Sequence, residues 1–189
     1  MNFVTRFFLG AKHWQVFLLI FGPYCAGQAL AMKSMFTGQP TAGVGGFGIL
    51  FWVLMALFGF CFLSWFWAMG WFLESIVRPD LKLKMGLFRF AVIYTVLYAL
   101  FFFRFVLSTP RVAVLLVVPL HLLAMFCLLY MLYFNSKSLA LVEKQRPVKF
   151  SDYAGSFFLL WFFLIGVWII QPKINRLYGE KGGILAKPE

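Results

Sequence analysis

The sequence predicts an all-α protein that lies within a membrane as a polytopic bundle of about five transmembrane helices. Of its 189 residues, 63% are hydrophobic and only 12% are charged, whereas a soluble domain averages about 45 to 50% apolar and about 25% charged residues. The 26 Phe, 7 Trp and 7 Tyr residues carry more apolar surface than a soluble chain of this length can bury. The apolar runs also lack the polar and apolar alternation of barrel strands.

Five apolar stretches have roughly the 20 residues that a helix needs to cross the hydrocarbon layer. They cover residues 14–32, 47–73, 86–108, 112–134 and 153–170. The breaks between them carry Gly, Pro or charged residues, so we expect a single integral membrane domain over residues 1–189. At about 1.5 Å per residue, the second stretch would be about 40 Å long and should tilt or project beyond the hydrocarbon.

The fifth stretch leaves two architectures open. It is the shortest of the five and contains Gly166. If it is re-entrant or lies in the interface, the chain has four spans and a carboxyl-terminal helix that does not cross. With the amino terminus inside, five spans place nine Lys and Arg on the inner side and six outside, and four spans change this count to thirteen and two. Both counts favour a cytoplasmic amino terminus.

His121 is the one imidazole deep in a predicted span, and it follows Pro119 by two residues. Proline has no amide hydrogen, so the carbonyl around Leu115 loses its usual partner and the turn should bend. An ionisable residue within hydrocarbon is a candidate proton relay or ligand contact. The simpler interpretation is a neutral histidine that forms a hydrogen bond with a neighbouring helix.

Three further polar residues lie in predicted spans. Gln28 is surrounded by small residues and would form a hydrogen bond across a close helix contact. Arg89 and Arg104 lie near opposite ends of the third span, where long side chains can reach the headgroups. Their separation of fifteen residues indicates anchoring at the two membrane surfaces better than one shared site.

A basic segment follows the fourth span and holds Lys137, Lys144, Arg146 and Lys149. We expect residues 135–152 to form a cytoplasmic arm whose first half continues the fourth helix, with its apolar residues against lipid. The second half would lie along anionic headgroups, which attract basic residues. The alternative is a solvated linker.

The sequence contains no motif that indicates catalysis, a cofactor or a metal. It lacks a His-Glu-x-x-His pair, a P-loop and a Gly-rich serine elbow, so we predict no catalytic residue and do not expect an enzyme. The three cysteines lie in separate apolar stretches without metal-ligand spacing. The net charge of +11 is distributed between apolar stretches, which favours anionic lipid over nucleic acid as its partner.

Two segments carry a resemblance to known proteins. They are Lys12-His13-Trp14-Gln15 with the four residues that follow, and residues 152–175 from Asp152-Tyr153 to Ile174-Asn175. Both resemble an uncharacterised family of small bacterial multi-pass membrane proteins. This resemblance covers about a quarter of the chain. It implies the cytoplasmic membrane of a bacterium, and it implies no activity.

Two functional hypotheses follow. The first is an accessory protein, scaffold or subunit of a membrane complex, with the lipid bilayer and other membrane proteins as partners. The alternative is a transporter or channel subunit that uses the polar turn at His121, with Gln28, Tyr94 and Tyr98 as its lining. A hydrated cavity that reaches His121 would favour the alternative, and a dry, packed His121 would exclude it.

Overall fold

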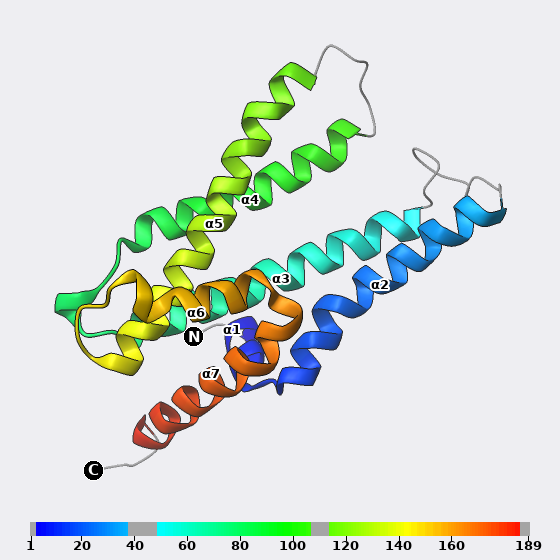
Figure 1. Cartoon of the computed structure of the whole chain (residues 1–189). Coiled ribbons are helices and arrows are strands. Elements are labelled where there is room, and N and C mark those ends of the chain that lie inside the picture. The colour runs from blue at the N-terminus through cyan, green and yellow to red at the C-terminus, as the bar shows by residue number, and fades with distance from the viewer. Residues whose placement is uncertain (1–2, 38–48, 107–113, 186–189) are drawn as a thin grey trace.

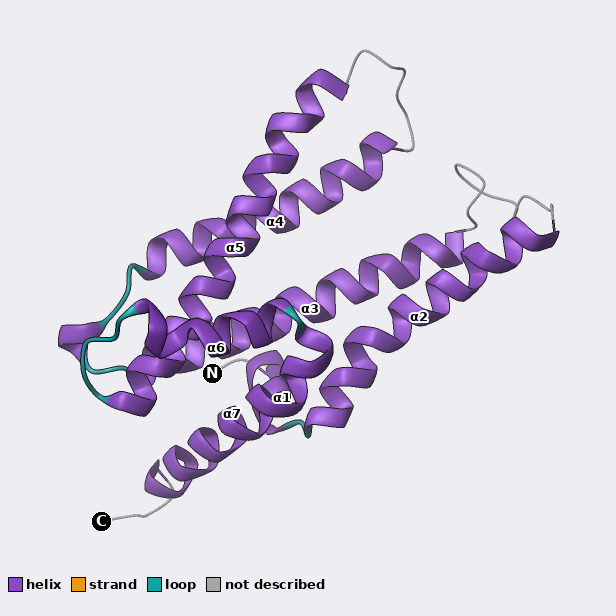
Figure 2. Cartoon of the chain, in the orientation of Figure 1, coloured by secondary structure: helices purple, strands orange, loops and turns teal. Residues whose placement is uncertain are grey.

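The computed structural model describes residues 3–37, 49–106 and 114–185, whose regular structure is entirely helical (Figure 1; Figure 2). These residues form seven α-helices and one 3-10 turn, with no strand among them. The elements are α1 (Phe3–Gly10), α2 (His13–Thr37), α3 (Ile49–Ile76), η2 (Pro79–Leu81), α4 (Met85–Val106), α5 (Val114–Lys144), α6 (Phe150–Trp161) and α7 (Phe163–Leu185). The predicted all-α class is confirmed.

Four helices contain stretches that are long and apolar enough to cross a membrane. These stretches are His13–Thr37, Ile49–Ile76, Met85–Phe102 and Val117–Lys144. They coincide with the first four predicted spans, so the chain is a membrane-embedded helical protein by the length and composition of its helices. The sequence reasoning gave no helix at α1, which holds only eight residues.

The helices form two antiparallel hairpins that diverge from a common base (Figure 1). One hairpin is α2 with α3, and the other is α4 with α5. We use "base" for the end of the bundle where α3 and α5 end and where α1, α6 and α7 pack against them. Away from the base, each hairpin exposes large apolar side chains such as Leu50 and Leu122.

The core lies in the base, where large aromatic side chains are fully buried. The rings of Phe88 and Phe134 stack with centroids 4.4 Å apart, and both residues have an exposed fraction of 0%. Gly70 makes room for this stack because a Cβ atom at that position would lie 2.5 Å from Cζ of Phe88. A glycine on α3 therefore allows α4 and α5 to approach it closely.

The predicted fifth helix is divided, and the five-span architecture is not confirmed. Instead of one helix over residues 153–170, α6 ends and α7 begins on either side of Phe162. The amide of Phe162 donates to the carbonyl of Phe158 at 2.8 Å, and the amide of Gly166 donates to the carbonyl of Phe162 at 2.9 Å. A Cβ atom at Gly166 would collide with the backbone of Leu159, so this sharp turn requires glycine.

Both ends of the divided segment lie beside the same end of α5. At its start, Asp152 accepts hydrogen bonds from Nζ of Lys144 and, at 2.9 Å, from the backbone amide of Lys149. At its end, Nζ of Lys173 lies 3.0 Å from Oε1 of Glu143. Helices α6 and α7 therefore form a hairpin of which both arms lie beside the end of α5 (Figure 1).

The basic segment is partly as predicted. Helix α5 does continue to Lys144, but its apolar residues do not face lipid. Leu139, Ala140, Leu141 and Val142 are all buried, because α6 packs against α5 and this part of the chain lies in the base. The prediction that these residues face lipid is wrong. An apolar composition is typical of a lipid-facing surface and of a protein interior alike, so it does not distinguish them.

Candidate functional site

The polar turn after Pro119 is joined to α4 by two tyrosines. The hydroxyl of Tyr98 lies 2.7 Å from Nδ1 of His121, and the hydroxyl of Tyr94 donates to the carbonyl of Leu120 at 3.0 Å. Tyr94 and Tyr98 are four residues apart on α4 and therefore lie on one face of that helix. The predicted hydrogen bond between His121 and a neighbouring helix is present.

His121 lies on an apolar, exposed face of α5. The exposed neighbours Val118, Leu122 and Met125 lie on the same face. Nδ1 is occupied by Tyr98, and within the described part of the chain Nε2 has no hydrogen-bond partner. An imidazole nitrogen that meets only hydrocarbon loses hydrogen-bond free energy. This face therefore favours a neighbour that supplies a polar group.

The structure does not bring Gln28 together with this turn. Gln28 is half-buried on α2, which belongs to the other hairpin (Figure 1). The close helix contact expected in this region is present at the adjacent Gly27, where a Cβ atom would lie 2.5 Å from Cε of Met55 on α3. The lining expected for a transporter, with Gln28 beside His121, is not assembled in the described residues.

Arg89 and Arg104 lie near opposite ends of α4. Arg89 is exposed, and its guanidinium carbon lies 5.2 Å from the centre of the Trp71 ring. Arg104 lies two residues before the end of α4, and its side chain is outside the described part of the structure. The predicted separation along one helix is therefore present, and anchoring at two surfaces stays a prediction.

Some of the predicted headgroup contacts have protein partners. Nζ of Lys137 donates to the hydroxyl of Tyr133 at 2.9 Å. Lys144 and Arg146 both approach the carboxylate of Asp152, Arg146 at 3.6 Å. The hydrogen bond from Lys144, followed by the one from the backbone amide of Lys149, holds the pKa of Asp152 below its usual value. Lys149 is exposed, and the contacts of these four residues with lipid stay a prediction.

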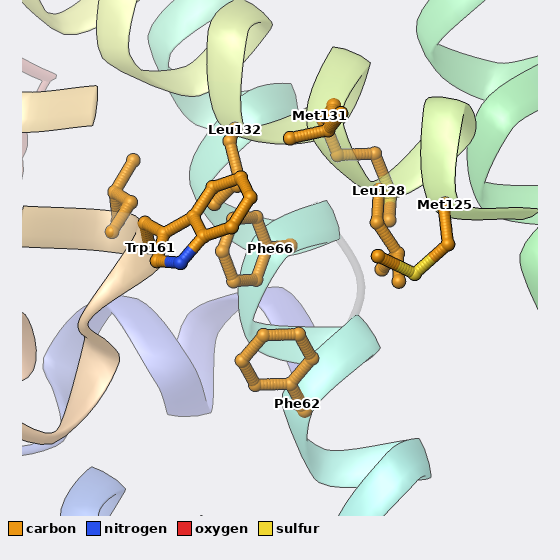
Figure 3. Close-up of a pocket in the computed structure, with 9 residues that line it drawn as sticks. Phe62, Phe66, Met125, Leu128, Met131, Leu132 and Trp161 are labelled. Carbon is orange, nitrogen blue, oxygen red and sulfur yellow. The ribbon is translucent and has the colours of Figure 1, made fainter. Parts of the chain in front are cut away.

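Two apolar cavities lie between the two hairpins, and each also borders one helix of the base. The first, of about 170 Å³, is formed by α3, α5 and α6, and Trp161 points into it beside Phe66 and Leu132 (Figure 3). The second, of about 310 Å³, is formed mainly by α3 and α4, with Val4 of α1 at its edge. Neither cavity is lined by His121.

A buried polar cluster around Gln171 is the feature that sequence reasoning missed. Gln171 on α7 is fully buried and accepts a hydrogen bond from Nε1 of Trp65 at 2.8 Å. Its amide nitrogen lies 2.7 Å from the carbonyl oxygen of Phe8 and 3.0 Å from that of Ala11, which also accepts from Nδ2 of Asn175 at 3.0 Å. The carbonyl of Phe8 lies in the last turn of α1, where no amide of the helix can reach it, and Ala11 follows that helix directly. The sequence feature that could have revealed this cluster is the pair of amides Gln171 and Asn175, which lie four residues apart directly after an apolar run.

Comparisons and metal-ligand geometry do not identify a family or a metal centre. Within the described residues, no three His, Cys, Asp or Glu side chains are grouped so that they could hold a metal ion. Comparison with protein-family models, with curated proteins and with solved structures finds no match.

Proposed function

We propose that the protein is an accessory or scaffold subunit of a membrane complex in the cytoplasmic membrane of a bacterium. The observation that carries the proposal is the position of His121 on an exposed apolar face of α5, with one ring nitrogen held by Tyr98. The partner that fits this face is a transmembrane helix that places a polar side chain, such as Ser, Thr, Asn or Gln, opposite Nε2.

The two diverging hairpins support this proposal. The outer parts of α4 and α5 contact each other but expose Leu97 and Phe126, with exposed fractions of 60% and 67%. Lipid chains can cover such side chains, but they offer nothing to an imidazole nitrogen. A polar residue of a partner helix satisfies Nε2 and at the same time buries the apolar neighbours of His121.

The proposed topology has four spans and a re-entrant hairpin, with the amino terminus in the cytoplasm. At about 1.5 Å per residue, the 12 residues of α6 extend for about 18 Å, which is shorter than the roughly 30 Å hydrocarbon layer. Lys149 and Lys173 both lie near the end of α5, which supports an entry and an exit on the same side. The base would then face the cytoplasm, where basic residues accumulate.

Purification from native membranes tests the proposed role. The tagged protein, produced at its natural level and extracted in a mild detergent, should elute with a second membrane protein in defined stoichiometry. His121→Leu should release that protein, whereas the matched control Gln28→Leu, on the other hairpin, should retain it. A chain that elutes alone before and after substitution would contradict the proposal.

The second candidate is a transporter or channel subunit, and the gathering of Tyr94, Tyr98 and His121 at the proline turn favours it. It requires water at His121. A His121→Cys variant without the native cysteines should react with a small water-soluble thiol reagent if this candidate is right. The accessory-subunit proposal predicts that the same cysteine is protected in native membranes.

A further inference from the structure

The larger apolar cavity lies between α3 and α4 and has the form of a cleft. Its volume of about 310 Å³ lies at the lower end of the range of about 300 to 1,000 Å³ that small-molecule sites occupy. Gly59, Leu63 and Trp67 line it from α3, and Val92, Val96 and Leu100 line it from α4. This lining offers almost no hydrogen-bonding groups, so the part of a ligand that lies here must be hydrocarbon.

The face of α4 that lines the cleft continues to a cation at the base. Arg89, Val92, Val96 and Leu100 are separated by three, four and four residues, so they lie on one side of the helix. The distance from Arg89 to Leu100 is about 16 Å along the axis, because eleven residues rise about 1.5 Å each. This is close to half of the roughly 30 Å hydrocarbon layer, or the depth of one leaflet.

Two tryptophans of α3 lie at the end of the cleft that is nearest to the base. The rings of Trp67 and Trp71 stack with centroids 5.8 Å apart, so Trp71 extends the cleft beyond Trp67 toward the base. The guanidinium of Arg89 lies 5.2 Å from the centre of the Trp71 ring. Tryptophan prefers the headgroup level of a bilayer, so this pair marks the depth at which hydrocarbon gives way to headgroups.

Arg89 is available to a ligand. Two nearby cations have carboxylate partners: Arg78 lies 3.0 Å from Asp80, and Lys82 lies 3.2 Å from Glu74. Within the described residues, no carboxylate forms an ion pair with Arg89, whose side chain is exposed. A guanidinium binds phosphate oxygens through two parallel hydrogen bonds.

We propose that the cleft between α3 and α4 binds one anionic diacyl phospholipid, whose acyl chain lies between Leu63 and Val96 and whose phosphate contacts Arg89. Trp71 covers the glycerol and headgroup region. The site is independent of the proposed partner surface, which lies around His121 on α5.

Native mass spectrometry of the purified protein in detergent tests the site with three probes. These are a phosphatidylglycerol, a phosphatidylcholine with the same acyl chains, and inorganic phosphate. The unchanged protein should bind one phosphatidylglycerol tightly, phosphatidylcholine more weakly, and free phosphate not at all. Arg89→Gln should weaken phosphatidylglycerol binding about tenfold, the scale of one charge-assisted contact, and weaken phosphatidylcholine binding less, because the choline cation offsets the charge of its phosphate.

A second variant tests the hydrocarbon part of the site. A Cβ atom at Gly59 meets nothing within 4 Å, so Gly59→Leu fills the cleft without a clash at its first carbon. This substitution should weaken the binding of both lipids, whereas the matched controls Gly155→Leu and Arg176→Gln should leave the binding of both unchanged. If Arg89→Gln does not fold, Arg89→Lys replaces it, because the charge is kept and the two-pronged contact is lost. The proposal is overturned if the cleft variants bind phosphatidylglycerol normally, if the controls lose it equally, or if free phosphate binds at Arg89.

Discussion

The indole N–H of Trp65 donates to Oε1 of Gln171 at 2.8 Å, which joins α3 to α7 across 106 positions of sequence. Both side chains are buried, with exposed fractions of 1% and 0%. The amide nitrogen of Gln171 simultaneously donates to the carbonyl of Phe8 in α1 and to that of Ala11 directly after it. One glutamine therefore holds three helices of the base together.

Gln171→Leu should lower the free energy of unfolding by roughly 3 kcal/mol, because it leaves the indole N–H of Trp65 and the carbonyl of Phe8 buried without partners. Asn175→Ala should cost less, about 1 kcal/mol, since Gln171 still reaches the carbonyl of Ala11. Denaturant titration in a fixed detergent measures both values. Equal losses for the two variants would show that Gln171 has no special role.

Gly70→Ala should destabilise the base by about 1 to 3 kcal/mol, the usual cost of overpacking a core. The new methyl group would lie 2.5 Å from Cζ of Phe88, which is held in its stack with Phe134. Gly59→Ala on the same helix is the matched control, because nothing lies within 4 Å of its Cβ position. Thermal unfolding of both variants in detergent should separate them, and similar midpoints would argue against the tight contact.

Asp152 should make the connection between α5 and α6 sensitive to acid. Folding lowers the pKa of its carboxyl group, chiefly through the hydrogen bond from Lys144. The contribution of Asp152 to the free energy of unfolding is therefore fully present above the pKa that this residue has in the unfolded chain. The contribution is lost as the pH falls through its lower pKa in the folded protein. Unfolding measured across the acid range should show a flatter pH dependence for Asp152→Asn.

The two basic residues beside Asp152 provide a second test of its acid sensitivity. Lys144→Gln should flatten the profile more than Arg146→Gln, because Lys144 donates directly to the carboxylate and the nearest nitrogen of Arg146 is 3.6 Å away. An unchanged profile for Asp152→Asn would rule out this carboxylate as the origin of the acid sensitivity.

Cysteine labelling should distinguish four spans from five. In a variant without the native cysteines, an impermeant maleimide added outside should label a cysteine at position 34. Cysteines at positions 75, 149 and 176 should react only after the membrane is permeabilised. Labelling of position 176 from outside would show that the chain crosses the membrane a fifth time. The reverse pattern at positions 34 and 75 would show that the orientation is opposite to the proposed one.

Sequence reasoning succeeded where a residue's effect is local. The lengths of the apolar runs predicted the four helices that are long and apolar enough to cross a membrane, and Pro119 with His121 indicated a polar turn that binds a neighbouring helix. It failed where the outcome depends on distant contacts. The turn at Phe162 depends on the approach of Gly166 to Leu159, and the burial of Leu139 depends on how α6 folds over α5. Apolar composition alone does not distinguish a lipid-facing residue from a packed one.

The central claim, that His121 faces a polar group of a partner helix, is tested most directly by photo-crosslinking in native membranes from position 122, which is 54% exposed. The measurement compares the adduct yield of the unchanged protein with those of His121→Gln and His121→Asn. Glutamine places its amide near the position of Nε2, whereas asparagine places it near Nδ1 and keeps only the contact with Tyr98. We predict one discrete protein adduct that His121→Gln retains and His121→Asn reduces about tenfold. Equal yields in all three proteins, or adducts with lipid alone, would contradict the account.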